Sequence, residues 1–324
     1  MKRWRRIRNL LGVALVALLP LLVSHCSKKQ AGPIRGLTPE ERARLQAAHD
    51  PWDNRKIPAQ TDKKLLPPDR LEALGDLALE NRDFESSLVN YLHILNAEPQ
   101  RDDLRYKVGV IFLMTGQLEP AQKELAEVLI HKPEMLQAHE ALGLVHMQQQ
   151  KYPLALEEFQ IVLSQDPKRA KTRYLLGITY LEAGQTEKAI YELQKALDLD
   201  SRQASSYLAL GQAYNQLKDF KHAVTCLKKA QELSPQNDKV NYQLGMALAG
   251  LKEYGEALEA FMKAGDEAQA YNNIGVHYYL DGRYEEAAKC FQRAIELRPT
   301  FYQEAKNNLQ RALEKLQQAG KDGS

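Results

Sequence analysis

The residues best suited to chemistry are three cysteines and a group of histidines. Cys26, Cys226 and Cys290 are far apart in the sequence, so they form neither a CxxC motif nor a disulfide framework. His139 and His146 lie two turns apart on one predicted helix, but His146 falls on its packing side. No Ser/His/Asp set, phosphate-binding loop or acidic pair is recognisable. We therefore predict no catalytic residue, no metal and no cofactor, and we do not expect an enzyme.

Cys26 is suited to a different reaction, the attachment of lipid to its sulfur. A basic segment, residues 2–8, precedes an apolar run over residues 10–23, the pattern of a signal peptide over residues 1–25. Residues 23–26, Val-Ser-His-Cys, resemble the lipobox of bacterial lipoproteins, in which the cysteine is diacylated. His25 departs from that motif, which has Gly, Ala or Ser before the cysteine. The alternative is an uncleaved signal anchor.

Both alternatives predict that the rest of the chain is exported, because the Lys/Arg-rich end stays in the cytoplasm. Ser27 stands where the lipoprotein resemblance would place Asp for retention in the inner membrane. A periplasm-facing lipoprotein of the outer membrane is therefore favoured over an inner-membrane anchor. Residues 26–67 are polar and contain several prolines, which predicts a flexible tether.

The charge balance argues against nucleic acid as a partner. Five of the 44 basic residues lie within residues 1–25, so the remaining chain carries 39 basic and 42 acidic residues, a net charge of −3. Nucleic-acid binding needs clustered Lys and Arg to displace counterions. We expect protein or peptide ligands, and a membrane contact only through the N-terminal segment.

The elements that would position any site follow a repeat of about 34 residues. The glycines that mark it are evenly spaced except for a shorter final interval: Gly75, Gly109, Gly143, Gly177, Gly211, Gly245 and Gly275. An apolar residue precedes each glycine, a small residue (Ser87 or alanine) follows it by twelve positions, and a bulky residue follows by sixteen. This pattern resembles the tetratricopeptide repeat family over residues 68–318.

The resemblance implies an all-α fold, a right-handed α-solenoid of seven helical hairpins over residues 68–299. Gly116, Gly184 and Gly282 fall between the two helices of a hairpin, where a left-handed residue is needed. At the short interval, Gly265 is expected to end one helix and Asp266 to begin the next. Residues 300–318, which start with a capping box, predict a capping helix, and residues 319–324 a disordered tail.

The register also predicts a partner-binding groove on the first helix of each hairpin, at six and three positions before the glycine and at one and four after it. The groove residues expected at these positions are Tyr106, Val110, Leu113, Leu144, Met147, Tyr174, Ile178, Leu181, Tyr242, Met246, Asn272 and Tyr279, and Asn273, adjacent to Asn272, is included with them. Apolar side chains edged by amides suit an amphipathic helix or an extended peptide. The alternatives are that the apolar residues pack between neighbouring first helices, and that the asparagines are solvated.

Cys226 and Cys290 occupy the same place on the second helices of hairpins five and seven. Other hairpins have Glu124, Glu158 and Glu192 there, which predicts a solvent-facing position and free thiols.

These features predict an exported, membrane-anchored scaffold that assists assembly of a cell-envelope complex. The combination of a lipobox-like start with repeats resembles the lipoproteins of Tad/Flp pili and the pilotins of type IV pili. Two alternatives are a partner protein in envelope polysaccharide export and a regulatory array that recruits an enzyme.

Overall fold

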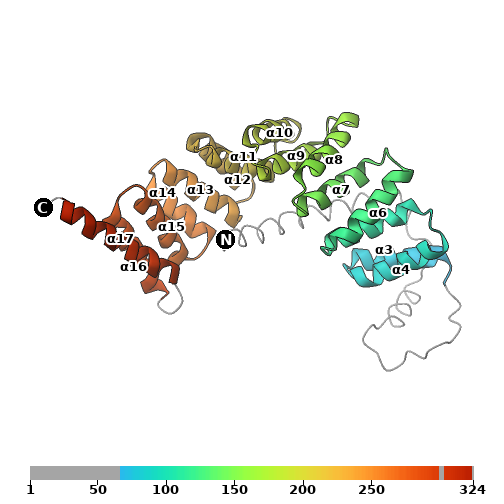
Figure 1. Ribbon diagram of the computed structural model, residues 1–324, viewed down its shortest axis with the longest axis horizontal. Helices are drawn as coiled ribbons and strands as arrows, with labels where there is room; N and C mark the ends of the chain where they lie inside the picture. The colour runs from blue at the N-terminus through green and yellow to red at the C-terminus, as the bar shows by residue number, and fades with distance from the viewer. Residues whose placement is uncertain (1–65, 299–302, 323–324) are drawn as a thin grey trace, which may run out of the picture. The chain divides into compact units, whose positions relative to one another are not determined.

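The computed structural model describes residues 66–298 and 303–322, which form fifteen helices, α3 to α17, and no strand (Figure 1). The predicted signal peptide, Cys26, almost all of the tether and the capping-box residues 300–302 lie outside the described residues. The chain divides into two compact units, Met1–Glu158 and Phe159–Ser324.

The described part of the first unit consists of helical hairpins joined by short turns. Its helices are α3 (Pro68–Glu80), α4 (Phe84–Ala97), α5 (Asp102–Met114), α6 (Leu118–His131), α7 (Leu136–Gln148) and the first half of α8 (Tyr152–Gln165). We call the first helix of each hairpin helix A and the second helix B. Helices α3 and α5 pack on their own B helices, and α4 and α6 also pack on the A helices that follow them.

The second unit continues the same pattern from the second half of α8. Its other helices are α9 (Ala170–Glu182), α10 (Thr186–Leu199), α11 (Ala204–Gln216), α12 (Phe220–Leu233), α13 (Asp238–Gly250), α14 (Tyr254–Ala264), α15 (Glu267–Leu280), α16 (Tyr284–Leu297) and α17 (Gln303–Asp322). From α9 to α17 each helix contacts the next, so the hairpins stack as in an α-solenoid. The all-helical prediction is confirmed.

The register glycines allow helix A to lie directly against helix B. A Cβ atom added to Gly177 would be 2.7 Å from Cγ of Leu193 and 2.9 Å from its Cδ2, and one added to Gly245 would be 2.7 Å from the ring of Phe261. Real carbon–carbon contacts are about 3.5–4.0 Å. Leu193 and Phe261 are both buried, so the bulky residue fills the space that the glycine leaves, as the repeat pattern predicts.

The turn inside every hairpin contains one left-handed residue, seven positions after the register glycine. Three are the predicted glycines, Gly116, Gly184 and Gly282, with φ of 75°, 74° and 76°. The other four are not glycine: Arg82, Gln150, Lys218 and Lys252 have φ between 58° and 65°. The repeat therefore imposes this conformation even on residues for which it is sterically strained.

The short interval between Gly245 and Gly275 corresponds to a shorter helix B, α14. Helix α14 has 11 residues, whereas the other B helices have 14. Gly265 is its C-cap, with extended backbone, and Asp266 is the N-cap of α15, where its carboxylate accepts a hydrogen bond from the Gln269 N–H at 3.0 Å. Both predicted cap positions are confirmed.

Helix α17 covers the end of the second unit. Ala305 and Ala312 are fully buried, and Leu309 packs on the cluster formed by Ala287 and Phe291 of α16. The helix ends at Asp322, beyond the predicted end of the capping helix at residue 318.

Candidate protein-binding surface

Some A helices are fixed to their surroundings by a basic side chain four positions before the register glycine. Arg105 donates to Glu124 of α6 and to the carbonyl of Pro99, both at 2.8 Å. Arg173 does the same two repeats later, with Glu192 at 2.8 Å and the Pro167 carbonyl at 3.1 Å. We call this arrangement the A–B clasp. The carboxylate side chain in each of the two clasps is only 15% exposed, so a mostly buried, charge-assisted hydrogen bond ties the A helix to the B helix of the same hairpin.

The predicted groove residues of the first unit are all buried. They are Tyr106, Val110, Leu113, Leu144 and Met147. Helices α5 and α7, which carry them, contact each other. Their burial fits the alternative that they pack rather than face a partner.

The predicted residues of the second unit divide into two groups. Tyr174, Leu181 and Asn272 are buried. Asn272 also accepts a hydrogen bond from Asn308 of α17 at 3.1 Å, so its amide oxygen is engaged with the capping helix. The residues that keep surface exposed are Ile178, Tyr242, Met246, Asn273 and Tyr279, which we call the A-helix strip.

Tyr242 is the most exposed member of the A-helix strip, at 41%. The centre of its ring lies 5.7 Å from that of the buried ring of Phe261, so the two rings pack against each other. His277 Nε2 lies 3.3 Å from the sulfur of Met246, and the His277 ring stacks on Phe261 at 6.1 Å. Burial lowers the pKa of His277, which favours the neutral ring beside Met246 at pH 7.

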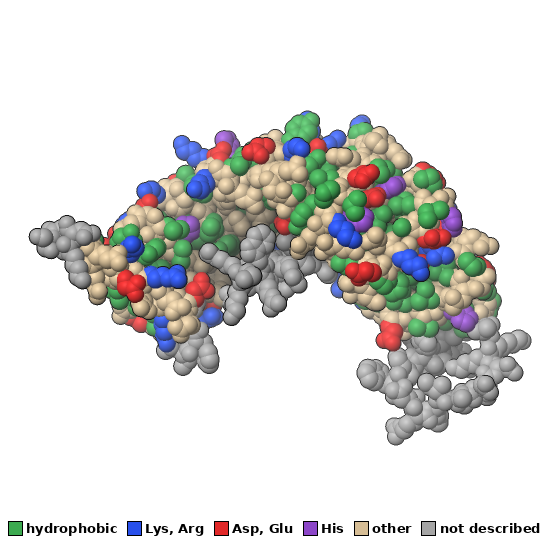
Figure 2. Space-filling view, in the orientation of Figure 1, with side chains coloured by type: hydrophobic (Ala, Val, Ile, Leu, Met, Phe, Trp, Pro, Cys, Tyr) green, Lys and Arg blue, Asp and Glu red, His purple; other side chains and the backbone are tan. Residues whose placement is uncertain are grey.

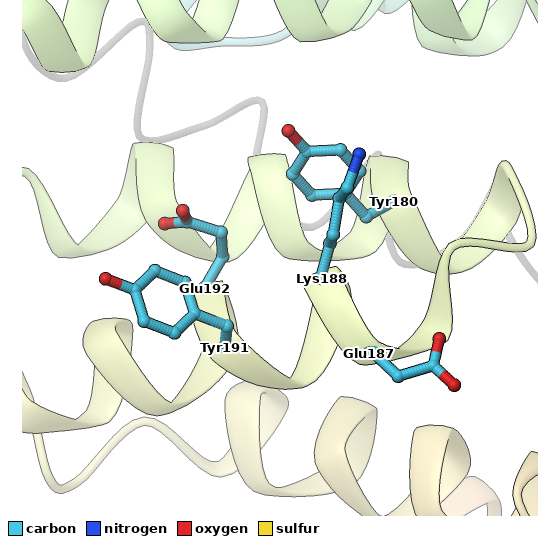
Figure 3. A pocket seen from close by; sticks show the side chains of 5 residues that line it. All are labelled: Tyr180, Glu187, Lys188, Tyr191 and Glu192. Atoms are coloured by element: carbon cyan, nitrogen blue, oxygen red, sulfur yellow. The ribbon is translucent and has the colours of Figure 1, made fainter.

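A second feature, which the sequence did not indicate, is a hollow of about 370 Å³ on α9 and α10 (Figure 3). Tyr180, Glu187, Lys188, Tyr191 and Glu192 line it. Figure 3 shows Lys188 extending toward Tyr180, with its Nζ 5.5 Å from the ring centre, and Glu187 turned away from the others. Three of the five lining residues already have hydrogen-bond partners: Glu192 pairs with Arg173, Lys188 donates to Gln185 at 2.9 Å, and the Tyr180 hydroxyl accepts from Gln160 at 3.2 Å.

Four family profiles described as tetratricopeptide repeat or TPR repeat match the chain. They match residues 115–170, 179–218, 204–237, 238–264 and 268–301, which together exceed half of the chain. The chain belongs to the tetratricopeptide repeat family. Its TPR array indicates a protein–protein interaction scaffold.

Solved TPR structures share the fold. A tetratricopeptide repeat protein from Parabacteroides merdae matches 76% of this chain and 98% of its own, with 15% identity and a TM-score of 0.56. Pseudomonas aeruginosa PilF matches 66% and 97%, with 22% identity and a TM-score of 0.52. MamA from Desulfovibrio magneticus RS-1 matches 55% and 98%, with 26% identity and a TM-score of 0.50. No curated protein sequence matches the chain.

The two thiols of the TPR array lie deeper than predicted. Cys226 and Cys290 are only partly exposed, and burial raises the pKa of each to about 11. The sequence suggested a solvent-facing position because glutamates occur there in other repeats. Those glutamates are themselves mostly buried, because they pair with Arg105, His139 and Arg173. The prediction of solvent-facing thiols is wrong, since both thiols are only partly exposed.

The charged surface of the TPR array is mixed. On the face drawn in Figure 2, Lys and Arg side chains are interspersed with Asp and Glu. Within residues 66–298 and 303–322, no group of three or more His, Cys, Asp and Glu is placed to hold a metal ion. In the same part of the chain, no helix combines the length and apolar character needed to cross a membrane.

Proposed function

We propose that this chain is an exported, membrane-anchored TPR scaffold that assists assembly of a cell-envelope complex such as a pilus or secretion system. The basic and apolar residues before Cys26 support export and anchoring, with an outer-membrane lipoprotein favoured. The stacked hairpins support a scaffold.

The A-helix strip is the observation that carries the proposal. Partly exposed Ile178 and Met246 and the exposed ring of Tyr242 offer contact area on helices α9 and α13, and on α15 Tyr279 adds a second ring and Asn273 an amide. Aromatic and methionine side chains contribute strongly at protein interfaces, and amides pair with a peptide backbone. The strip therefore suits an extended or helical protein segment with apolar anchors.

Partner capture tests the scaffold. Tyr242→Ala removes the most exposed ring of the strip while leaving the register glycines and clasps untouched. We expect the affinity-purified variant to lose most of a partner that the unmodified chain retains, and Tyr191→Ala, which removes an exposed ring on helix α10, to retain it. Equal recovery with both variants would move the partner site away from the strip.

Membrane attachment needs a separate experiment. Globomycin, which blocks lipoprotein signal cleavage, should cause the precursor to accumulate, and Cys26→Ser should release the chain from outer-membrane fractions. A chain that is unaffected by both would be an uncleaved signal anchor or would not be attached.

A further inference from the structure

One A–B clasp contains a histidine where its neighbours contain arginine. His139 lies one repeat after Arg105 and one repeat before Arg173, at the same place on its helix A. Its carboxylate partner Glu158 likewise lies one repeat from Glu124 and from Glu192. The hairpin of α7 and α8 therefore has the same clasp, built with a side chain that titrates near neutral pH.

The ring of His139 has an acceptor at each nitrogen. Nδ1 lies 2.6 Å from Oε2 of Glu158, and Nε2 lies 2.9 Å from the carbonyl oxygen of Pro133. A neutral imidazole has a single N–H and can donate to only one of them, whereas the imidazolium donates to both. The doubly protonated ring thus donates to a glutamate and to a proline carbonyl at once, as the guanidinium groups of Arg105 and Arg173 do in the adjacent clasps.

The polar and charged groups around the ring come from its own helix and from the elements packed against it. From α8, Glu158 faces it, and the turn between α6 and α7 contributes the Pro133 carbonyl. On α5 and α6, Arg105 and Glu124 bond to each other. On α7 itself, Glu140 is adjacent in sequence, and His146 lies two turns further on.

The contacts of the ring and its burial act on the titration of His139. The hydrogen bond to Glu158 raises the pKa of His139, burial opposes it without cancelling it, and the hydrogen bond to the Pro133 carbonyl also raises it. Burial lowers the pKa of His146, so that ring is already neutral where His139 loses its proton.

We propose that His139 makes the α7–α8 hairpin pH-responsive: its imidazolium closes the clasp on Pro133 and Glu158, and loss of a proton opens one of the two hydrogen bonds. A group whose pKa is raised on folding stabilises the fold fully below its unfolded pKa, about 6.5, and that stabilisation is lost as pH rises through the folded pKa. The clasps of Arg105 and Arg173 keep their charge over this range.

Amide hydrogen exchange of the full chain between pH 6 and pH 8.5 tests the proposal, after correction for intrinsic exchange. We expect protection of the α8 amides over residues 155–158 to fall by about tenfold as pH rises, the loss of one charge-assisted hydrogen bond. Protection of the α10 amides over residues 189–192, behind the arginine clasp, should not fall. His139→Arg should remove the pH dependence in α8, because arginine serves this position in the neighbouring hairpins.

Two further measurements keep the test decisive if His139→Arg perturbs folding. The ring of His139, followed by nuclear magnetic resonance, should titrate above pH 6.5, and Glu158→Gln should lower that midpoint. His222→Arg, at an exposed histidine that pairs with Asp219, should leave the exchange of α8 unchanged. A His139 midpoint at or below 6.5, or a pH dependence that persists in a folded His139→Arg chain, would overturn the proposal.

Discussion

Gly177→Ala tests the packing of helix A on helix B at one atom. The added methyl carbon would lie 2.7 and 2.9 Å from two carbons of Leu193 and 3.4 Å from the carbonyl oxygen of Ala189. Relief requires a shift of roughly 1 Å, since carbon atoms pack at about 3.5–4.0 Å. Leu193 is fully buried, so it has no open space into which to turn.

The expected cost is the difference between two opposing effects. Overpacking of a buried site costs about 1–3 kcal/mol, and this clash belongs at the upper end because two carbons are involved. Alanine gains about 1 kcal/mol over glycine in a helix. We therefore expect Gly177→Ala to lower the free energy of unfolding by about 2 kcal/mol, measured by urea denaturation followed by circular dichroism.

A matched control and a rescue separate packing from helix propensity. Gly255 is also helical, but a Cβ there would meet nothing within 4 Å, so Gly255→Ala should be neutral or stabilise by up to about 1 kcal/mol. Leu193→Ala should cost about 2–5 kcal/mol alone, and the double variant with Gly177→Ala should cost less than the sum. If Gly177→Ala is as stable as the unmodified chain, or if the two effects add, the close-approach argument is wrong.

The remaining predictions concern turns, thiols and clasps. Lys218→Gly should stabilise the chain by about 1 kcal/mol by relieving a left-handed lysine, and Gly184→Ala should destabilise it by a similar amount; urea denaturation measures both, and opposite signs would refute the turn argument. At pH 8, Cys226 and Cys290 should react with iodoacetamide roughly a hundredfold more slowly than a thiol of ordinary pKa, and at ordinary rates after denaturation, as peptide mapping by mass spectrometry would show. Arg173→Met should lower the free energy of unfolding by about 1–3 kcal/mol, because its carboxylate partner stays mostly buried without a donor; a neutral result in urea denaturation would mean that the clasp is not stabilising.

The hairpins could be predicted from the sequence because their packing is local. Each register glycine and its bulky partner are sixteen positions apart, so one spacing specifies both helices and their contact. The left-handed turn residue could be predicted only where it is glycine, as at Gly184. At Lys218 the residue type opposes the conformation, and only the position in the repeat reveals it.

The clasps could have been predicted from the spacing of their residues, although not from the residue types taken singly. Arg105, His139 and Arg173 recur once in each successive repeat, and a glutamate follows each by nineteen positions. A glutamate on a helix normally faces solvent, which is why the positions of Cys226 and Cys290 were expected to be exposed. The ion pair is what allows those carboxylates to be mostly buried.

The exposure of the groove residues could not be predicted from periodicity. A repeat register identifies which side of helix A a residue occupies, but burial there depends on how closely the successive A helices approach. Tyr106 and Tyr242 occupy the same register position, three positions before their glycines, yet Tyr106 is buried and Tyr242 is 41% exposed. Asn272, at the same register position as Tyr242, is buried, and it accepts a hydrogen bond from Asn308 of α17. No residue within its own repeat indicates that contact.

Site-specific photocrosslinking in living cells tests the scaffold and its surface most directly. A photoreactive amino acid would replace Tyr242 in one strain and Tyr191, which is 57% exposed on helix B, in another. We predict that the probe at 242 yields a discrete adduct with another polypeptide, that Met246→Ala weakens it, and that the probe at 191 yields no such adduct. The same adducts from both positions, or an adduct from position 191 alone, would contradict partner binding by the A-helix strip.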